Sequence, residues 1–467
     1  MIKIDLNNIS SASAGQANGL DDNSLFEAVD RFSGIIPLVL EEHSRGGLGF
    51  MNLPYQPKLV REIDAYAVKN AKKYDNFVVL GIGGSALGAS AVHTAINTPF
   101  HNLLPDRKRK SPRMFFPDNV DPEEIAFLAN NIDAKKTMFN VISKSGDTAE
   151  ILANFQIFLK ILKTKLGRNY RNNLIITTDR EKGFLRKFAD REGIKSFEVP
   201  QGVGGRFSVF SPVGLVPLAF AGVNNAKLLK GAATMDSACR NTEPYRNPAF
   251  MLALANYLMD TKKGKSIIVM MAYSESLREV ADWFCQLWGE SLGKRYKTDG
   301  SEIYCGQTPV KAIGATDQHS QIQLYNEGPN NKLIVFIEVE KFRENVKIPG
   351  MFPEQPEAGY LNNKTLTELL NKEKTGTEIA LTKNGRPNYT VKMKNISEET
   401  VGGLLHLWEA ATVFAGKLYG INAFDQPGVE AGKNISRALM GQKGTEKTSA
   451  EISGLAEKHS QKLVISV

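Results

Sequence analysis

The residues in this chain that are best suited to chemistry lie in six short segments. In chain order these segments read VVLGIGGSALGASA (78–91), VISKSGDTAE (141–150), QGVGGRFSVFSPVG (201–214), SESLREVADWFCQLWGESLGK (274–294), GATDQHSQIQLY (314–325) and FDQPGVEAGK (424–433). Between them they offer glycine-rich backbone, serine and threonine hydroxyls, an arginine, a glutamate, a histidine and lysines. These are groups that bind anions or move protons, so anion binding and acid–base chemistry are the first hypotheses for each segment.

The first segment predicts an anion-binding turn. An apolar strand enters GIGGS (81–85) and a helix leaves it, so helical N–H groups, the backbone at Gly84 and the Ser85 hydroxyl can face one ligand. The run also satisfies the Gly-x-Gly-x-x-Ala dinucleotide pattern, but the acid that this pattern requires after the second strand comes too late, at Asp118. A tight turn without a ligand is the third interpretation.

The second segment places Ser143, Lys144, Ser145 and Thr148 between an expected strand and an expected helix. Ligands bind at the carboxyl ends of parallel strands. Hydroxyl and backbone N–H groups hold a phosphate monoester without a metal, which suffices when the phosphate is a handle and is not transferred. The structural alternative is a strand end followed by a helix N-cap.

Two segments offer a cation and a base. Arg206 sits among glycines past the fifth expected strand, where its permanent charge could stabilise a developing oxyanion, although it could also be a surface arginine. Glu290 lies off the apolar stripe of a helix, in the last turn before Gly293, so helix geometry alone predicts a solvated glutamate. The helix dipole disfavours a carboxylate there, which would help to keep its pKa high enough for a base.

The fifth segment carries a histidine. Thr316 or Asp317 is expected to cap a helix with His319 in its first turn, where the positive end of the dipole favours neutral imidazole. A neutral histidine can shuttle protons, and a histidine without a role is the alternative.

The sixth segment imitates a phosphate-binding loop, but too few residues separate its glycines and Asn434 stands where serine or threonine is required. Nucleotide hydrolysis therefore loses its main support. With Asp425 as N-cap, Lys433 lies inside a helix, either as a surface lysine or as a cation delivered to a cleft.

The elements that must position these residues follow an α/β pattern. Residues 1–75 read as mixed helix and loop, with a helical stretch at 59–73, and we expect an N-terminal arm. Five apolar or β-branched runs alternate with helices after it, which predicts a doubly wound parallel sheet. The expected strands are Phe77–Leu80, Arg113–Phe116, Met138–Ile142, Leu174–Thr177 and Ser196–Val199.

A second alternation predicts a second α/β domain. It consists of the strand Lys265–Ala272, the helix Glu275–Gly293, a helix beginning near Asp317, the strand Leu333–Glu338 and the helix Glu398–Tyr419. We therefore expect an arm (1–75), two α/β domains (76–225 and 246–420) and a C-terminal helical segment (421–467).

The composition is typical of a globular protein. The 467 residues are 42% hydrophobic and 23% charged, which is a globular balance that argues against disorder. Three cysteines without a CxxC motif and six scattered histidines predict neither a disulfide framework nor a metal site. We expect a cytoplasmic protein without a membrane span or a signal peptide. A net charge of +8 spread over this length is a poor indicator of nucleic-acid binding, and we expect none.

In their order and content the six segments resemble the phosphoglucose isomerase family, also called glucose-6-phosphate isomerase. The resemblance runs from about residue 78 to residue 433 and is carried by GIGGSALG, SKSGDT, GVGGRFSVFSPVG, QLWGESLGK, DQHSQIQ and FDQPGVEAGK. It implies two sugar-isomerase (SIS) α/β domains, a homodimer with shared active sites, and no metal or other cofactor. It also implies a small-molecule sugar-phosphate substrate. The implied reaction is the reversible isomerisation of glucose 6-phosphate and fructose 6-phosphate, in glycolysis and gluconeogenesis, through ring opening and a cis-enediolate.

The resemblance also implies a role for each matched residue. Glu290 would be the base, Gly205 and Arg206 would stabilise the enediolate, and Lys433 would open the sugar ring together with a His319 that reaches the partner's site. The substrate-binding residues would be Gly84, Ser85, Ser143, Lys144, Ser145, Thr148, Gly205 and Gln426. Ile151 stands where many members have Thr, and Pro427 stands where the longer eukaryotic type has Trp, which bears on subtype. The length suits the shorter bacterial type.

Three alternatives stay open. A bifunctional phosphoglucose/phosphomannose isomerase would reuse the same base at C2. A non-catalytic sugar-phosphate-binding SIS protein would not need Glu290, His319 and Lys433 together. An NAD-dependent dehydrogenase would use only the first segment.

Overall fold

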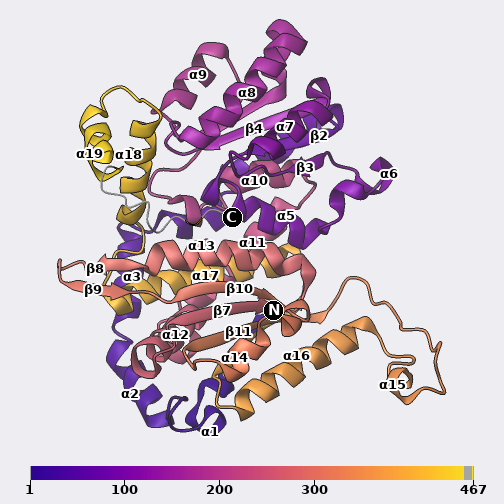
Figure 1. Cartoon of the computed structure of the whole chain (residues 1–467), viewed down its shortest axis with the longest axis vertical. Coiled ribbons are helices and arrows are strands. Elements are labelled where there is room, and N and C mark those ends of the chain that lie inside the picture. The colour runs from indigo at the N-terminus through magenta and orange to yellow at the C-terminus, as the bar shows by residue number, and fades with distance from the viewer. Residues whose placement is uncertain (1, 457–464, 466–467) are drawn as a thin grey trace.

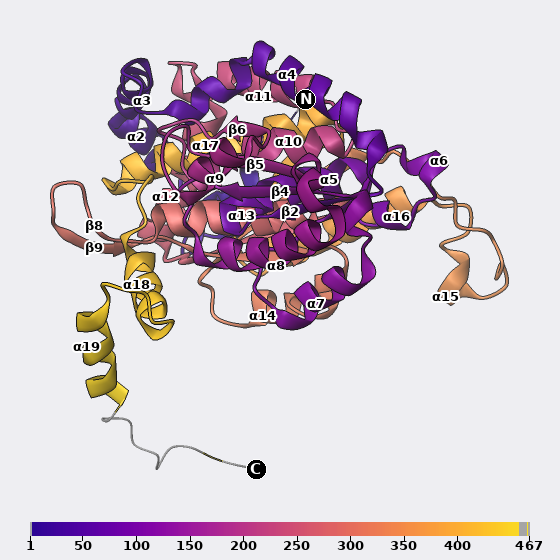
Figure 2. The same cartoon turned by 90° about the horizontal axis from the view of Figure 1, so that it is seen from above.

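The computed structural model describes residues 2–456 and 465, and it contains two five-stranded sheets with helices around and between them (Figure 1). A short two-stranded sheet, β8 with β9, projects from the body on the side opposite the loop that carries α15, in both views (Figures 1 and 2). The strands are β1 (Ile2–Asp5), β2 (Asn76–Leu80), β3 (Arg113–Phe115), β4 (Thr137–Ser143), β5 (Leu174–Thr178), β6 (Ser196–Glu198), β7 (Ile267–Ala272), β8 (Lys294–Tyr296), β9 (Glu302–Cys305), β10 (Thr308–Ile313), β11 (Lys332–Lys341) and β12 (Asn388–Asn395).

The first sheet is parallel throughout, with strand order β3-β2-β4-β5-β6. Its central strands β2, β4 and β5 are buried along their whole length, as expected when helices cover both faces of a parallel sheet. All five strands expected for this sheet are confirmed. The strand order reverses between β2 and β4, and ligands bind in the crevice beyond such a switch point. The GIGGS and SKSGDT segments begin there.

The second sheet differs in part from the expectation. Its order is β1-β12-β11-β7-β10, with β12, β11, β7 and β10 parallel and β1 antiparallel at the edge. The strands β7 and β11 are confirmed, whereas β10 and β12 were not expected. The first strand of the expected arm therefore pairs with β12 in the second sheet, and the residue boundaries of the domains stay predictions.

The α-helices connect and cover the two sheets, and several of them pack between the sheets. Helix α13 packs against α5, α17 and β10, so the helix that carries Glu290 spans the junction of the two halves (Figure 1). Across the described residues, every helix is too short or too polar to cross a lipid bilayer. The helices are α1 (Ser11–Ala14), α2 (Asp22–Phe32), α3 (Ile35–Ser44), α4 (Pro57–Asn70), α5 (Leu87–Asn97), α6 (Asp106–Arg109), α7 (Pro122–Asn131), α8 (Ala149–Leu166), α9 (Phe184–Glu192), α10 (Pro212–Phe220), α11 (Asn225–Cys239), α12 (Pro248–Lys263), α13 (Arg278–Leu292), α14 (Ile322–Glu327), α15 (Pro356–Gly359), α16 (Leu366–Lys383), α17 (Glu398–Tyr419), α18 (Glu430–Leu439) and α19 (Glu446–Ala456).

Candidate active site

One cleft of about 730 Å³ collects residues from five of the six segments. It lies where the loops after β2 and β4 meet the C-terminal end of α13 and the start of α18. Ten of the sequence-predicted residues line it: Gly84, Ser85, Lys144, Ser145, Thr148, Gly205, Arg206, Glu290, Gln426 and Lys433. Ser143 lies directly behind this lining, and His319 is not part of it.

The first and third segments touch through their glycines. A Cβ atom at Gly84 would lie 2.3 Å from the carbonyl carbon of Gly205, so no side chain fits there. The Ser208 hydroxyl donates to the carbonyl of Gly84 at 3.3 Å and to that of Gly205 at 2.6 Å. The two glycine-rich turns are therefore held in direct backbone contact, with Ser85 at the cleft edge of one and Arg206 on the other.

The second segment forms a cluster of hydroxyl groups. The Oγ atom of Ser143 lies 2.9 Å from Oγ1 of Thr148 and 3.4 Å from Oγ of Ser145. Ser143 ends β4 and Thr148 stands at the N-cap of α8, as the structural alternative predicted, but the Thr148 hydroxyl makes no capping hydrogen bond to the helix. The cluster lies at the N-terminal end of an 18-residue helix, a favourable place for a phosphate group.

Lys144 joins the second segment to the third. Its ammonium group donates to the carbonyl oxygen of Val203 at 2.7 Å. Burial lowers the pKa of Lys144 from its ordinary value, and the nearby Asp179 carboxylate opposes that shift. Lys144 thus adds positive charge at the edge of the hydroxyl cluster and fixes the loop that leads to Arg206.

Arg206 is almost completely buried, with 3% of its surface exposed. Its guanidinium donates to Ser291 Oγ at 2.7 Å, and its remaining bonds reach Glu290 and the segment 423–426. The surface-arginine alternative is therefore wrong. Burial lowers the pKa of the guanidinium from its ordinary value, and the Glu290 carboxylate opposes this shift. The full set of its other acceptors is Glu290 Oε2 at 3.2 Å, Gln426 Oε1 at 2.6 Å, the Ala423 carbonyl at 2.6 Å and the Asp425 carbonyl at 3.0 Å.

Glu290 is half-buried, with 31% of its side chain exposed toward the cleft, rather than fully solvated as helix periodicity alone predicted. Gln286, four residues earlier and on the same face of α13, donates from Nε2 to Glu290 Oε1 at 3.2 Å. Gln286 was not among the site residues expected from the sequence, although its spacing of four residues from Glu290 could have identified it. One carboxylate therefore faces the cleft with its orientation set by Arg206 and Gln286.

The sixth segment closes the cleft from the C-terminal side. Helix α18 begins at Glu430 with Val429 at its N-cap, so the expectation that Asp425 caps this helix is wrong. The cap position moves because a short 3-10 helix, Pro427–Val429, precedes α18. Lys433 does lie inside the helix, lines the cleft and donates to Glu430 Oε1 at 3.0 Å. In Figure 2, α18 and α19 project from the body of the molecule.

His319 is exposed and lies elsewhere, at the carboxyl end of β10. It ends a 3-10 helix, Thr316–His319, whose N-cap is Ala315, so the expected helix capped by Thr316 or Asp317 is wrong. The Asp317 carboxylate instead accepts from the Ile313 amide at 2.7 Å and from the Ser320 hydroxyl at 2.6 Å. Both neighbours of His319 are therefore held by hydrogen bonds. Ser320 bonds Asp317, and the side-chain amide of Gln318 bonds Tyr273 and Glu373. None of the described residues that line the cleft is a histidine.

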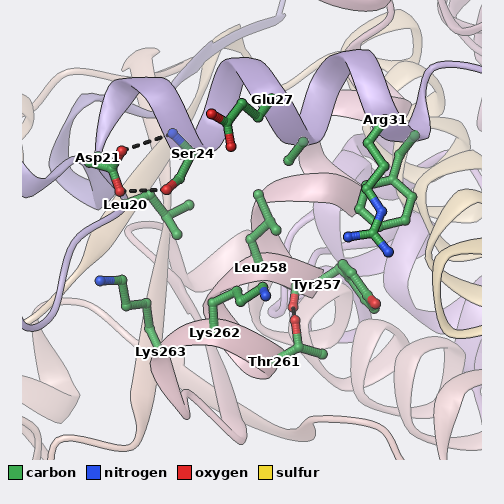
Figure 3. Close-up of a pocket in the computed structure, with 12 residues that line it drawn as sticks. Leu20, Asp21, Ser24, Glu27, Arg31, Tyr257, Leu258, Thr261, Lys262 and Lys263 are labelled. Carbon is green, nitrogen blue, oxygen red and sulfur yellow. Dashed lines mark hydrogen bonds between the residues drawn. The ribbon is translucent and has the colours of Figure 1, made fainter.

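A second cleft, of about 540 Å³, lies between α2 and the end of α12 (Figure 3). Its lining mixes both signs of charge, with Glu27 and Arg31 on α2 and Lys262 and Lys263 on α12. Asp21 is occupied in capping α2 through Ser24. This cleft contains no residue of the six segments.

The geometry of the first cleft suits a substrate that has an anionic group for binding and a C–H bond from which a base can remove the proton. Hydroxyl groups, glycine backbone and Lys144 line the cleft together with Glu290 and Arg206. Among the described residues, no three histidine, cysteine, aspartate or glutamate side chains come together in a way that could hold a metal ion.

Comparison with known proteins identifies the family. The family model described as Phosphoglucose isomerase matches residues 58–457. The chain belongs to the phosphoglucose isomerase family. The glucose-6-phosphate isomerase of Carboxydothermus hydrogenoformans is 46% identical, over 97% of this chain and 97% of the relative. The glucose-6-phosphate isomerase of Rubrobacter xylanophilus is 44% identical, over 91% of this chain and 96% of the relative.

Solved structures show the same fold. A hypothetical protein from Thermus thermophilus superposes with a TM-score of 0.82 at 37% identity, over 94% of this chain and 100% of that chain. A glucose-6-phosphate isomerase from Chlamydia trachomatis gives a TM-score of 0.74 at 24% identity, over 85% of this chain and 76% of that chain, and shows the same fold. The α/β fold with parallel sheets that the resemblance implied is confirmed.

Proposed function

We propose that this protein catalyses the reversible isomerisation of glucose 6-phosphate and fructose 6-phosphate, in the cytoplasm and as a homodimer. The observation that carries the proposal is the pairing of the Glu290 carboxylate with the buried Arg206 guanidinium, 3.2 Å apart, in the cleft that also holds the hydroxyl cluster. Relatives that cover nearly the whole chain and are named glucose-6-phosphate isomerase support it.

In the proposed mechanism the phosphate is a handle. Ser85 and the hydroxyl cluster of Ser143, Ser145 and Thr148 bind it with Lys144 beside them, and Gly84 allows the backbone to approach. No bond to phosphorus changes, so hydroxyl, amide and ammonium donors suffice. Binding there orients the sugar chain toward α13.

The isomerisation itself is a proton transfer between neighbouring carbons. Glu290 takes the proton from C2 of the open-chain aldose and returns it to C1, so one carboxylate serves both steps. The cis-enediolate oxygen gains negative charge in between. Arg206 and the amide of Gly205 stabilise that charge, and removal of a preorganised donor of this kind typically costs about 3 kcal/mol or more. Gln426, bonded to Arg206, helps to line the site.

Ring opening requires a proton on the ring oxygen and the loss of one from the C1 hydroxyl. Lys433 and His319 divide this work in the proposal. Because His319 is exposed outside the cleft of its own chain, we propose that it completes the site of the partner subunit. The homodimer is then part of the mechanism.

A coupled assay of the purified protein in EDTA tests the function. We expect fructose 6-phosphate to be converted to glucose 6-phosphate without added metal or nicotinamide in the isomerase step. Loss of activity in EDTA, restored by a divalent metal, would contradict the metal-free mechanism. Mannose 6-phosphate is the second substrate in the assay, and its conversion at a comparable rate would make the protein the bifunctional isomerase instead.

A further inference from the structure

Lys294 is a buried lysine to which the mechanism assigns no role. It follows Gly293 directly after α13, and 6% of its side chain is exposed. It does not line the cleft. Its ammonium group donates three hydrogen bonds, all to main-chain carbonyls: Glu290 at 2.7 Å, Ser291 at 3.0 Å and Asp425 at 3.0 Å. An ammonium group has three protons, so its donor capacity is fully used.

Two of these bonds are made to carbonyl groups in the last turn of α13, and one of these carbonyls belongs to Glu290. The last carbonyls of a helix have no partner within the helix, and a cation there interacts favourably with the negative end of the helix dipole. Lys294 meets both needs at the carbonyls of Glu290 and Ser291. The position of the Glu290 backbone, from which the carboxylate extends, is therefore fixed by Lys294.

The third bond connects that helix end to the segment that holds Arg206. The carbonyl oxygen of Asp425 accepts from Lys294 Nζ and from Arg206 Nη2, each at 3.0 Å. Arg206 also bonds the Ala423 carbonyl and the Gln426 side chain in the same segment. One carbonyl oxygen is thus shared by two buried cations. Lys294 also bonds the backbone of Glu290, and Arg206 is the group proposed to stabilise the enediolate.

The charges around this junction explain why a buried ammonium group is tolerated. The Glu290 carboxylate pairs with Arg206, and an Asp425 carboxylate oxygen lies 3.5 Å from Lys294 Nζ. A buried charge is costly unless it is paired and hydrogen-bonded, and here both conditions are met.

We propose that Lys294 is a positioning residue for the isomerisation, which fixes the Glu290 carboxylate relative to the Arg206 guanidinium by binding the end of α13 to the segment 423–426. The inference rests on the proposed function of this cleft. A misplacement of about 1 Å at a reacting group can cost about 100-fold in rate. The phosphate-binding hydroxyls lie on other loops, so Lys294 affects the rate of proton transfer rather than the binding of substrate.

The test is Lys294→Met, which keeps the aliphatic stem and removes the ammonium group. We expect kcat per folded protein to fall about 10- to 100-fold, while KM for glucose 6-phosphate stays within about threefold. We also expect a larger primary isotope effect on kcat with glucose 6-phosphate deuterated at C2, because proton transfer becomes more rate-limiting. A loss of folded protein alone would lower total activity and leave the isotope effect unchanged.

Lys265→Met is the matched control. Lys265 is 1% exposed, and its ammonium group also donates to carbonyl oxygens, both from Asn330, away from the cleft. We expect this variant to lose stability while kcat and the isotope effect stay at wild-type values.

Should Lys294→Met fail to fold, Lys294→Arg takes its place in both measurements, because a guanidinium keeps the charge but cannot make three bonds from one nitrogen. A folded Lys294 variant with wild-type kcat and an unchanged isotope effect would overturn the inference. If the wild-type protein itself does not isomerise glucose 6-phosphate, the proposed function fails first, and the two failures are distinguishable.

Discussion

Arg206 and Glu290 show how the surroundings of two residues set their chemistry. The guanidinium is held by side chains of α13 and by carbonyls of the segment 423–426, so it cannot follow the carboxylate if the latter moves. A donor fixed in this way needs no reorganisation when charge develops on the substrate, and such preorganisation is usually a large part of catalysis. The carboxylate keeps its access to the cleft through the third of its side chain that is exposed.

Replacement of Glu290 tests its proposed role as the base. For Glu290→Gln we expect kcat to fall by about 10²–10⁴, because the amide keeps the shape and the contact with Arg206 but cannot accept a carbon-bound proton. KM should stay within a few-fold, because the loops proposed to bind the phosphate are unchanged. Steady-state kinetics with fructose 6-phosphate measure both constants.

Glu279→Gln, on the same helix but outside the cleft, is the control and should retain the wild-type kcat. More than about a tenth of the wild-type rate in Glu290→Gln would assign the base to another residue.

At the scale of elements, the first sheet was predictable because its strands are short, apolar and bounded by helices. The two strands missed in the second sheet were missed for different reasons. Pro309 interrupts β10, which is tolerated because β10 is an edge strand. In β12, Tyr389, Val391 and Met393 alternate with Thr390, Lys392 and Lys394, so the period of two that indicates a strand was present and was overlooked. The pairing of β1 with β12 joins residues far apart in the chain, and no local pattern encodes it.

The candidate site was predictable by residue type and less so by geometry. The hydroxyls, Arg206 and Glu290 stand out because their segments end strands or helices. The burial of Arg206 depends on the segment 423–426, which is distant in sequence, so a single loop cannot reveal it. For the same reason the helix periodicity of α13 predicted a solvated Glu290, since it records only the packing of that helix against its own core.

Helix α17 contains a buried glutamate, Glu409, which makes the stability of the fold depend on pH. Glu409 is fully buried, and neither carboxyl oxygen has a hydrogen-bond partner among the described residues. On the same helix, Nδ1 of His406 lies 3.8 Å from Glu409 Oε2, and Nε2 of that imidazole lies 3.1 Å from Asp236 Oδ1 of α11. Burial raises the pKa of Glu409 well above its ordinary value. The folded state therefore retains a proton that the unfolded state releases above about pH 4.3.

The sign of the pH dependence follows from this difference. As pH rises from about 4.3 toward the raised folded-state pKa, the unfolded state is increasingly favoured, by up to about 1.4 kcal/mol per pH unit. We expect Glu409→Met to remove this loss, so that its gain in Tm over the wild type is larger at pH 8 than at pH 5. Thermal unfolding at the two pH values measures it. The exposed Glu354→Gln should show equal shifts at both, and an equal shift for Glu409→Met would contradict the expectation.

At the scale of the whole molecule, the proposed mechanism needs a group that one chain does not bring to its own cleft. His319 is exposed on a turn in which Asp317 accepts from the Ile313 amide and Gln318 bonds Tyr273 and Glu373. An exposed histidine on such a turn suits delivery to a second chain. The C2 symmetry of a dimer would give each site one such histidine from its partner.

Mixed dimers test this arrangement. We expect Glu290→Gln and His319→Ala proteins, each inactive alone, to recover activity when their subunits exchange. In a mixed dimer one site then carries both lesions and the other carries none. With random pairing half of the dimers are mixed, and each has one intact site of two, so activity should approach about a quarter of that of the wild type.

The control for this experiment pairs two lesions that both belong to one chain's own cleft. Mixing Glu290→Gln with Arg206→Lys leaves one lesion in every site of a mixed dimer, so no recovery is expected. Subunit exchange is verified independently, by isolating mixed dimers with two affinity tags. Isolated mixed dimers of Glu290→Gln and His319→Ala that are no more active than either parent would show that His319 acts within its own chain or has no part in the reaction, and the shared site would have to be abandoned.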